Sequence, residues 1–153
     1  MLTSGTHVVE WMAKQLKCTF GVCQGIGWMK DGEIVAGIVF DGYNQANIFV
    51  HIAKLRGERM PPTLIAAMFD YPFRQLQCKR LSAIISDRNE ASMGFARKLG
   101  ATVNGFLEDG AVDGNLVIFG LLRKDANKWL TKSLQRRLGV EHGRHPHRVG
   151  CHS

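Results

Sequence analysis

The spacing of hydrophobic residues along the chain predicts a mixed α/β fold. Apolar residues recur at helical intervals in three segments, and shorter apolar or alternating runs typical of strands lie between them. The predicted helices are residues 7–16, residues 64–76, and a third that follows capping residues at 87–89 and runs through Met93, Ala96 and Leu99. The predicted strands are residues 19–28, 34–40, 46–53, 81–86, 103–107 and 116–122. The expected order is therefore helix, three strands, helix, strand, helix and two strands.

Turn and capping residues support these boundaries. Asp31-Gly32 predicts a tight hairpin between the first two long strands, because this pair readily adopts positive φ. Pro72 cannot donate a backbone hydrogen bond, so we expect it to kink or end the middle helix. Asn89 is a candidate cap for the start of the third helix, and Gly100 suits its end.

Composition and charge divide the chain into a body and a basic end. With 153 residues, 45% hydrophobic and 22% charged, the chain is expected to form one ordinary domain with its own core. Residues 1–123 carry 13 Lys and Arg against 11 Asp and Glu, whereas residues 124–153 carry 7 against 2. Most of the net charge of +7 therefore belongs to the C-terminal end.

Two segments are predicted beyond the domain at residues 1–123. Residues 124–140 have the pattern of a basic amphipathic helix, with its apolar face formed by Ala126, Trp129, Leu130, Leu134 and Leu138. That face either packs on the domain itself or docks a partner, such as a second copy in a homodimer. Residues 141–153 resemble a flexible, His-rich tail whose spacing matches no defined zinc pattern, so no metal site is predicted.

The remaining sequence features predict a cytoplasmic protein without a membrane partner. The N-terminus has neither a basic segment nor an apolar segment typical of a leader, and the longest apolar run, residues 34–40, is too short to span a bilayer. The four cysteines form no CxxC pair and are expected to be reduced thiols.

Three motifs, in order, resemble those of the GNAT family of acyl-CoA-dependent N-acetyltransferases. Residues 89–100, NEASMGFARKLG, are similar to the family's Asn-x-x-Ser/Ala-x-x-x-x-x-Lys-Leu-Gly helix. Residues 71–81, YPFRQLQCKRL, resemble a segment of ribosomal-protein alanine acetyltransferases and of short bacteriophage-encoded members. Gly-Phe-Leu at 105–107 and Asp-Gly-Asn at 113–115 fit the family's closing hairpin, so the resemblance extends over residues 20–123.

The resemblance implies a GNAT fold, with a central, mostly antiparallel sheet of about six strands flanked by helices. It also implies transfer of an acetyl group from acetyl-CoA directly to an amine, without a metal. The subgroup points to a lysine or an N-terminal amine on a protein, and a phage enzyme would modify a host protein in the host cytoplasm. This substrate class rests on analogy alone.

By the same resemblance, the donor acetyl-CoA would be held at three places. The backbone of the third strand would contact it at Ile52 and Ala53, and the third helix would contact it through Asn89, Ser92 and Arg97. The family's glycine-rich phosphate loop corresponds to residues 56–61, RGERMP, which contains the candidates Arg56, Gly57, Arg59 and Met60. Here arginine and proline replace two expected glycines, and Pro61 lacks an N–H that could bind phosphate.

Two residues are candidates for the catalytic proton transfers. His51 lies on the third strand and is a residue type that titrates near neutral pH, so it is the preferred base. Asp41 and Glu33 are alternatives, although both lie in hairpin turns. Tyr71 is the candidate proton donor to the leaving thiolate, or else a residue at the edge of the core. The family's usual tyrosine position is Ala96 in this chain.

An alternative function belongs to a different class. The altered phosphate loop and the missing tyrosine also suit a catalytically inactive GNAT-fold binding module. Such a module would hold a protein or, less favoured, a nucleic acid through the basic C-terminal end.

Overall fold

The structure is a computed structural model that describes residues 1–130 and 149–150. Its elements in chain order are β1 (Leu2–Ser4), α1 (Thr6–Leu16), β2 (Val22–Lys30), β3 (Glu33–Asp41), β4 (Asn47–Lys54), α2 (Pro62–Asp70), the π-helix η1 (Tyr71–Gln75), β5 (Arg80–Ser86), α3 (Glu90–Leu99), β6 (Thr102–Ala111), β7 (Gly114–Leu122), α4 (Arg123–Ala126), the 3₁₀ turn η2 (Asn127–Trp129) and β8 (Val149–Gly150). The predicted order of helices and strands is confirmed. The pattern did not reveal β1, which is too short to show a period.

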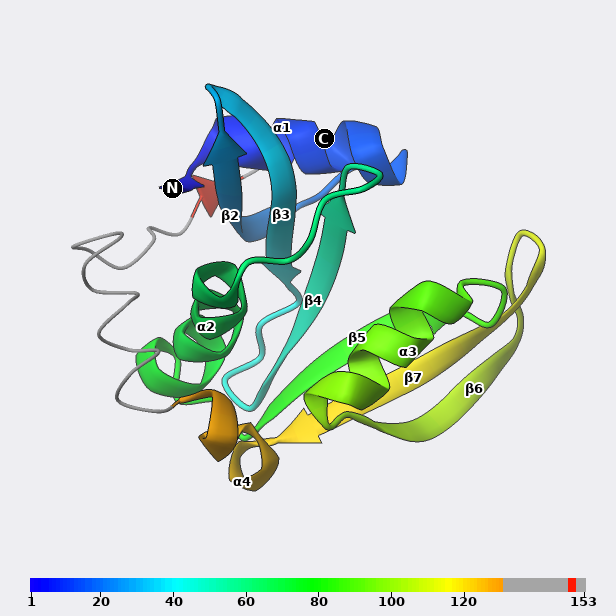
Figure 1. Cartoon of the computed structure of the whole chain (residues 1–153). Coiled ribbons are helices and arrows are strands. Elements are labelled where there is room, and N and C mark those ends of the chain that lie inside the picture. The colour runs from blue at the N-terminus through cyan, green and yellow to red at the C-terminus, as the bar shows by residue number, and fades with distance from the viewer. Residues whose placement is uncertain (131–148, 151–153) are drawn as a thin grey trace.

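The strands form one sheet in the order β1-β2-β3-β4-β5-β7-β6, with β8 beside β2. Every pairing is antiparallel except that of β4 with β5, which is parallel. The predicted mixed, mostly antiparallel sheet is therefore confirmed, with seven strands in its main path. Helices α1 and α2 lie on opposite faces, and α3 lies over β5 and β7 (Figure 1).

Helix α1 packs very closely on its face of the sheet because glycines line the strands beneath it. A Cβ at Gly37 would lie 2.8 Å from the sulfur of Met12, and one at Gly25 would lie 2.9 Å from a methyl carbon of Val9. Real Cβ atoms do not approach so closely, so a side chain at either position would displace the Met12 or Val9 side chain of α1. The glycines in this part of the sequence therefore set the distance between helix and sheet.

Helix α2 changes its hydrogen-bond pattern at the proline that was expected to kink or end it. The α-helix ends at Asp70, and the chain continues as a π-helical turn containing Pro72. The N–H of Leu76 donates to the carbonyl of Tyr71 at 3.0 Å, five residues earlier. Because Pro72 supplies no N–H, the regular pattern is interrupted and the longer loop of the π-turn replaces it.

The described part of the C-terminal segment packs on the domain itself. Ala126 is buried, and the Trp129 ring stacks on Phe69 with 5.6 Å between ring centroids. The indole N–H of Trp129 donates to the carbonyl of Leu99 at 2.8 Å. The start of the predicted apolar face therefore belongs to the core. The rest of the predicted helix, residues 131–140, and most of the His-rich tail lie outside the described residues.

The state of the cysteines differs from the sequence-based expectation, and the described helices are too short or too polar to span a membrane. Cys18 and Cys78 are free, but Cys23 is disulfide-bonded, so the expectation of four reduced thiols is wrong for Cys23. Within residues 1–130 and 149–150, no helix is long and apolar enough to cross a membrane.

Candidate active site

The sheet opens between its two parallel strands. β4 and β5 are paired at only three positions, which end with Phe49 opposite Ser82. Beyond this pair β4 continues beside β3 as far as Lys54, and β5 continues beside β7 as far as Ser86. The two halves of the sheet therefore diverge from a fixed point, as Figure 1 shows.

The divergence creates a cleft of about 1320 Å³ that crosses the sheet. His51 and Ile52 are consecutive strand residues, so their side chains point to opposite faces, yet both line this cleft. Leu16 at the end of α1 lines it on one side, and Phe95 of α3 lines it on the other. A ligand can therefore approach the edge of β4 from either face of the sheet.

One edge of β4 presents unpaired backbone groups to the cleft. The N–H of Leu55 donates to Val35 of β3, whereas the carbonyl of Ala46 accepts from the β5 side. Backbone groups alternate in direction along a strand, so Ile52 turns its N–H toward β5. Because the β4–β5 pairing has already ended at Phe49, that N–H points into the opening. It can donate to a carbonyl oxygen placed there.

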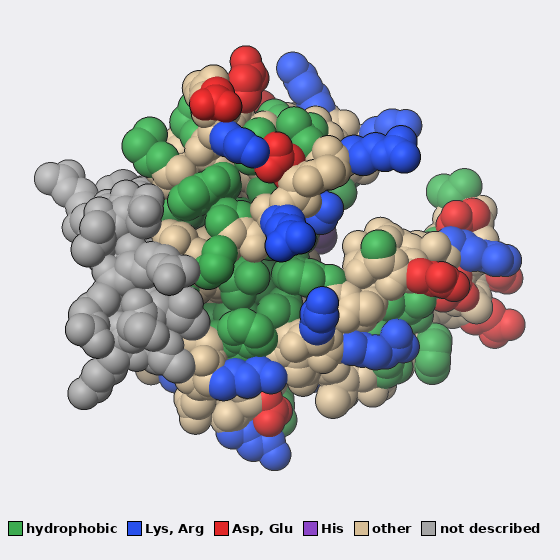
Figure 2. Space-filling view, viewed as in Figure 1, with side chains coloured by type: hydrophobic (Ala, Val, Ile, Leu, Met, Phe, Trp, Pro, Cys, Tyr) green, Lys and Arg blue, Asp and Glu red, His purple; other side chains and the backbone are tan. Residues whose placement is uncertain are grey.

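Basic side chains surround the cleft on the side of α2 and α3. Lys54, Arg59 and Lys98 all line it, and all three are exposed. Figure 2 shows Lys and Arg side chains gathered around the hollow in this face. Glu58 also lines the cleft, but Lys30 neutralises it at 3.5 Å. The net field on this side therefore favours an anion.

The loop before α2 supplies few backbone donors. Pro61 caps the helix and Pro62 follows it, so two successive residues have no N–H. The N–H groups of Leu64 and Ile65 already donate to the carbonyl of Pro61 at 3.0 and 3.1 Å. This helix terminus therefore lacks most of the amide donors that usually hold a phosphate.

The predicted loop residues separate into two groups. Arg59 and Met60 line the cleft, but Arg56 and Gly57 do not. Both of the latter are exposed, and Gly57 has a φ of 85°. The structure therefore brings only the second half of the predicted phosphate loop to the opening.

Helix α3 brings two of its three predicted residues to the cleft. Asn89 and Ser92 line it, and the Asn89 side chain caps the helix by accepting from the Ser92 N–H at 3.1 Å. Arg97 instead lies over the Phe119 ring at 5.7 Å and does not line the cleft. Its neighbour Lys98 takes the position at the opening.

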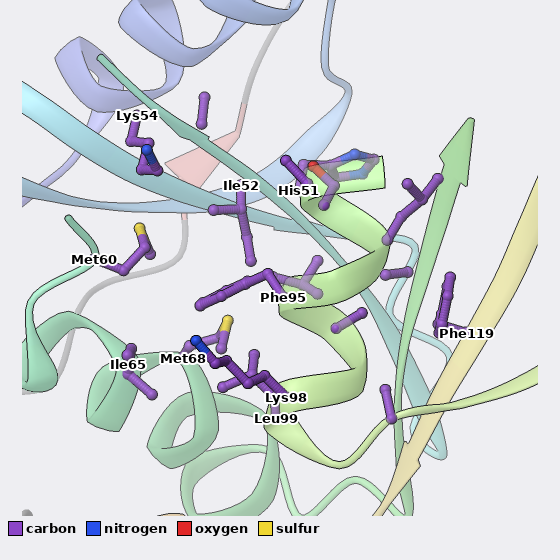
Figure 3. A pocket seen from close by; sticks show the side chains of 18 of the residues that line it. His51, Ile52, Lys54, Met60, Ile65, Met68, Phe95, Lys98, Leu99 and Phe119 are labelled. Carbon is purple, nitrogen blue, oxygen red and sulfur yellow. The ribbon is translucent and has the colours of Figure 1, made fainter. Parts of the chain in front are cut away.

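The interior of the cleft is apolar. Figure 3 shows Ile52, Met60, Ile65, Met68 and Phe95 around it, with Lys54 and Lys98 nearby. Such a lining suits the uncharged part of a long ligand. Sequence reasoning missed Met68 and Phe95, because a helical apolar residue carries no local mark that separates a cleft position from a core position. It also missed Lys54, the last residue of β4.

His51 is the predicted catalytic residue that the structure places at the cleft. Its Nε2 lies 2.8 Å from Oδ1 of Asp41 on β3, and the ring of Phe20 packs edge-on against the imidazole at 5.3 Å. Asp41 itself does not line the cleft. Glu33, the other alternative base, is exposed at the far end of β3 and also lies away from the cleft.

Tyr71 lies elsewhere. Its side chain is 5% exposed in the main core cluster, and its ring packs on Phe40 at 5.0 Å. It is not among the residues lining the cleft. This position agrees with the alternative assignment of Tyr71 to the edge of the core.

Solved structures with similar folds are acetyltransferases. The chain superposes on the spermidine/spermine N-acetyltransferase SpeG from Vibrio cholerae with a TM-score of 0.69 and 10% identity, over 84% of this chain and 97% of that chain. It superposes on the N-acetyltransferase PseH from Campylobacter jejuni, solved with acetyl coenzyme A, with a TM-score of 0.60 and 14% identity, over 80% and 99%. No protein-family model and no curated protein matches the sequence. The chain therefore has the GNAT fold.

Proposed function

We propose that the chain is an N-acetyltransferase that moves an acetyl group from acetyl-CoA directly to an amine. The observation that carries this proposal is the cleft across the sheet. It combines the unpaired N–H of Ile52 with His51 on the α1 side. On the side of α2 and α3 it has a basic rim formed by Lys54, Arg59 and Lys98. The resemblance of residues 71–81, 89–100, 105–107 and 113–115 to the GNAT motifs supports it independently of the fold.

The donor would bind from the side of α2 and α3. The apolar lining formed by Met60, Met68 and Phe95 suits the pantetheine arm of acetyl-CoA, and Asn89 and Ser92 offer polar groups beside it. Arg59, Lys54 and Lys98 would bind the phosphates. Charged side chains thereby take over part of the role that backbone amides play in a glycine-rich loop.

The reaction needs a neutral amine and a polarised thioester. An unperturbed alkyl amine, with a pKa of about 10.4, is almost fully protonated at neutral pH, so a base must remove one proton. His51 would accept that proton, and the amine nitrogen would then attack the acetyl carbonyl carbon. The N–H of Ile52 would stabilise the developing oxyanion. As the new C–N bond forms, the C–S bond breaks and the coenzyme A thiolate leaves to take up a proton.

A primary amine is the proposed acceptor class. The motif resemblance to ribosomal-protein alanine acetyltransferases favours a protein amine, either N-terminal or lysyl, and its phage subgroup favours a host protein. SpeG, whose structure is similar, is a spermidine/spermine N-acetyltransferase, so polyamines should be tested as acceptors in the same assay. Acetylation of peptides but not of spermidine would support the protein acceptor.

Binding of the donor tests the proposal before any acceptor is known. We expect acetyl-CoA to bind saturably in calorimetry and to raise the thermal unfolding temperature. Acetyl-pantetheine, which lacks the adenosine phosphates, should bind much more weakly. An absence of both binding and thermal shift with acetyl-CoA would refute the proposed acetyltransferase function.

A second candidate is a binding module with this fold but without turnover. The consecutive prolines Pro61 and Pro62 favour it, because they remove phosphate-binding amides. In that case coenzyme A would bind poorly or would be retained without transfer. Co-purified partners would then associate with the chain but remain unacetylated.

A further inference from the structure

Asp41 and His51 are diagonal neighbours on adjacent antiparallel strands. In the register of β3 and β4, Asp41 pairs with Phe49 and Val39 pairs with His51. All four side chains therefore point to the same face of the sheet, the face covered by α1. The contact between Oδ1 of Asp41 and Nε2 of His51 at 2.8 Å follows directly from this register.

This contact sets the tautomer of the imidazole. An ionised carboxylate can only accept hydrogen bonds, so Nε2 of His51 must carry the proton and donate it. The neutral ring then has its lone pair at Nδ1. Among the described residues, no hydrogen-bond partner is seen for Nδ1, so it remains able to accept a proton.

His51 and Asp41 lie at different positions relative to the cleft, so they can have different roles. His51 lines the cleft, whereas Asp41 does not. Phe20 packs edge-on against the imidazole, so the ring is held both by a hydrogen bond and by an aromatic contact. Of the two side chains, His51 is therefore the one that can contact a ligand in the cleft.

We propose that Asp41 is a positioning residue, which fixes the ring of His51 with Nε2–H toward β3 and with the Nδ1 lone pair available to the acceptor amine. This inference rests on the proposed function of His51 as the base. It goes beyond that function by naming the nitrogen that takes the proton and the residue that selects it. The sequence had instead presented Asp41 as a competing base.

The proposal predicts that replacing Asp41 affects turnover rather than donor binding. In Asp41→Asn the side chain can offer Nε2 either an acceptor oxygen or a donor amide, so both tautomers become accessible. We expect kcat to fall by about tenfold to a hundredfold, because misplacement of a reacting group has effects of this order. The Kd for acetyl-CoA should not change. Asp41→Glu, which restores the carboxylate, should recover part of the rate.

Glu33→Gln is the matched control. It removes a carboxylate from the same strand, but at an exposed position away from the cleft, so kcat should remain at the wild-type value. In a His51→Gln background, Asp41→Asn should cause little further loss, since there is no imidazole left to orient. Independent losses that multiply would contradict the proposed coupling.

Imidazole ¹⁵N NMR of the whole protein tests the geometry without reference to activity. We expect the Nε2–H tautomer for His51 in the wild-type chain and a mixture of tautomers in Asp41→Asn. An Nδ1–H signal in the wild type, or an unchanged rate in Asp41→Asn, would overturn the role of Asp41 even if acetyl transfer is confirmed. A chain without acetyl transfer, or with full activity in His51→Gln, would overturn the proposed function or its base, and the positioning role with it.

Discussion

Phe49 of β4 lies opposite Ser82 of β5, and this is the last pair before the two strands separate. The Ser82 hydroxyl donates to the side-chain oxygen of Asn47 and accepts from Nε of Arg80 at 2.7 Å. These bonds join β4 and β5 across their short paired stretch, from Asn47 and Arg80 at its start to Ser82 at its end. The opening beyond this pair is therefore anchored by a specific polar network, and Ile52 lies on the unpaired edge of β4 that follows.

Removal of the proposed base should lower turnover while the donor still binds. His51→Gln keeps polar groups at the cleft but cannot accept a proton at neutral pH. We expect kcat to fall by about a hundredfold or more, because positioned bases contribute rate factors of this order. The Kd for acetyl-CoA, measured by calorimetry, should remain unchanged.

His7→Gln is the control for that substitution. His7 is exposed and hydrogen-bonded to Thr3, away from the cleft, so its replacement should leave kcat unchanged. If His51→Gln retains the full rate, the base must be another group or solvent.

The basic rim should determine affinity for the phosphates of the donor. Arg59→Ala and Lys98→Ala each remove one cation from the cleft, so we expect the Kd for acetyl-CoA to rise by several-fold for each. The Kd for acetyl-pantetheine should not change, because that molecule lacks these phosphates. Lys124→Ala, at an exposed position away from the cleft, serves as the charge-matched control. An equal rise for both donors would indicate a structural effect instead.

Asn89 has a capping role that must be separated from cofactor binding. Its side chain accepts from the Ser92 N–H, so Asn89→Ala should cost about 1 kcal/mol of unfolding free energy. Asn89→Asp preserves the cap but removes the amide donor and adds a negative charge. We therefore expect weaker acetyl-CoA binding in both variants and a stability loss only in Asn89→Ala. If Asn89→Asp binds acetyl-CoA with wild-type affinity, Asn89 caps α3 but does not bind the donor.

The sequence allowed most of the fold to be predicted, because local chemistry fixes its boundaries. The positive φ values at Asp31 and Gly32, the interruption of the α-helix at Pro72 and the cap at Asn89 all follow from single residue types. The strand β1 was missed, since three residues cannot display a period. No single residue marks the separation of β4 from β5, which depends on the pairing of whole strands.

The candidate site was predicted less completely for the same reason. His51, Ile52, Ala53, Arg59, Met60, Asn89 and Ser92 were identified and do line the cleft. Arg56, Gly57, Arg97 and Tyr71 do not, because their distance from the cleft depends on tertiary packing. The contact between Asp41 and His51 depends on strand register, which the alternation of residues alone does not specify.

The buried thiol of Cys78 should make the unfolding free energy decrease at alkaline pH. Burial raises the pKa of this thiol above its ordinary value, and the nearby Arg123 opposes part of that rise. The unfolded chain therefore loses the proton at a lower pH than the folded chain does. The contribution of the protonated Cys78 thiol to the unfolding free energy is complete below the ordinary thiol pKa. It is lost as the pH rises toward the pKa of this thiol in the folded chain.

Chemical denaturation at pH 8 and pH 10 measures this effect. The unfolding free energy of the wild type should fall more between these pH values than that of Cys78→Ala. The comparison cancels the contribution of other alkaline groups that the two proteins share. An equal fall in both proteins would show that Cys78 does not contribute to the pH dependence.

Acetyl transfer itself tests the central claim most directly. The purified chain is incubated with acetyl-CoA and a panel of amines that includes spermidine, lysine peptides and peptides with free N-termini, and free coenzyme A and acetylated products are quantified by mass spectrometry. We predict amine-dependent release of coenzyme A with one acetylated amine formed per thiol released, and strong loss of both in His51→Gln. Saturable binding of acetyl-CoA without transfer to any amine would favour the binding module, and an absence of both binding and transfer would contradict the account.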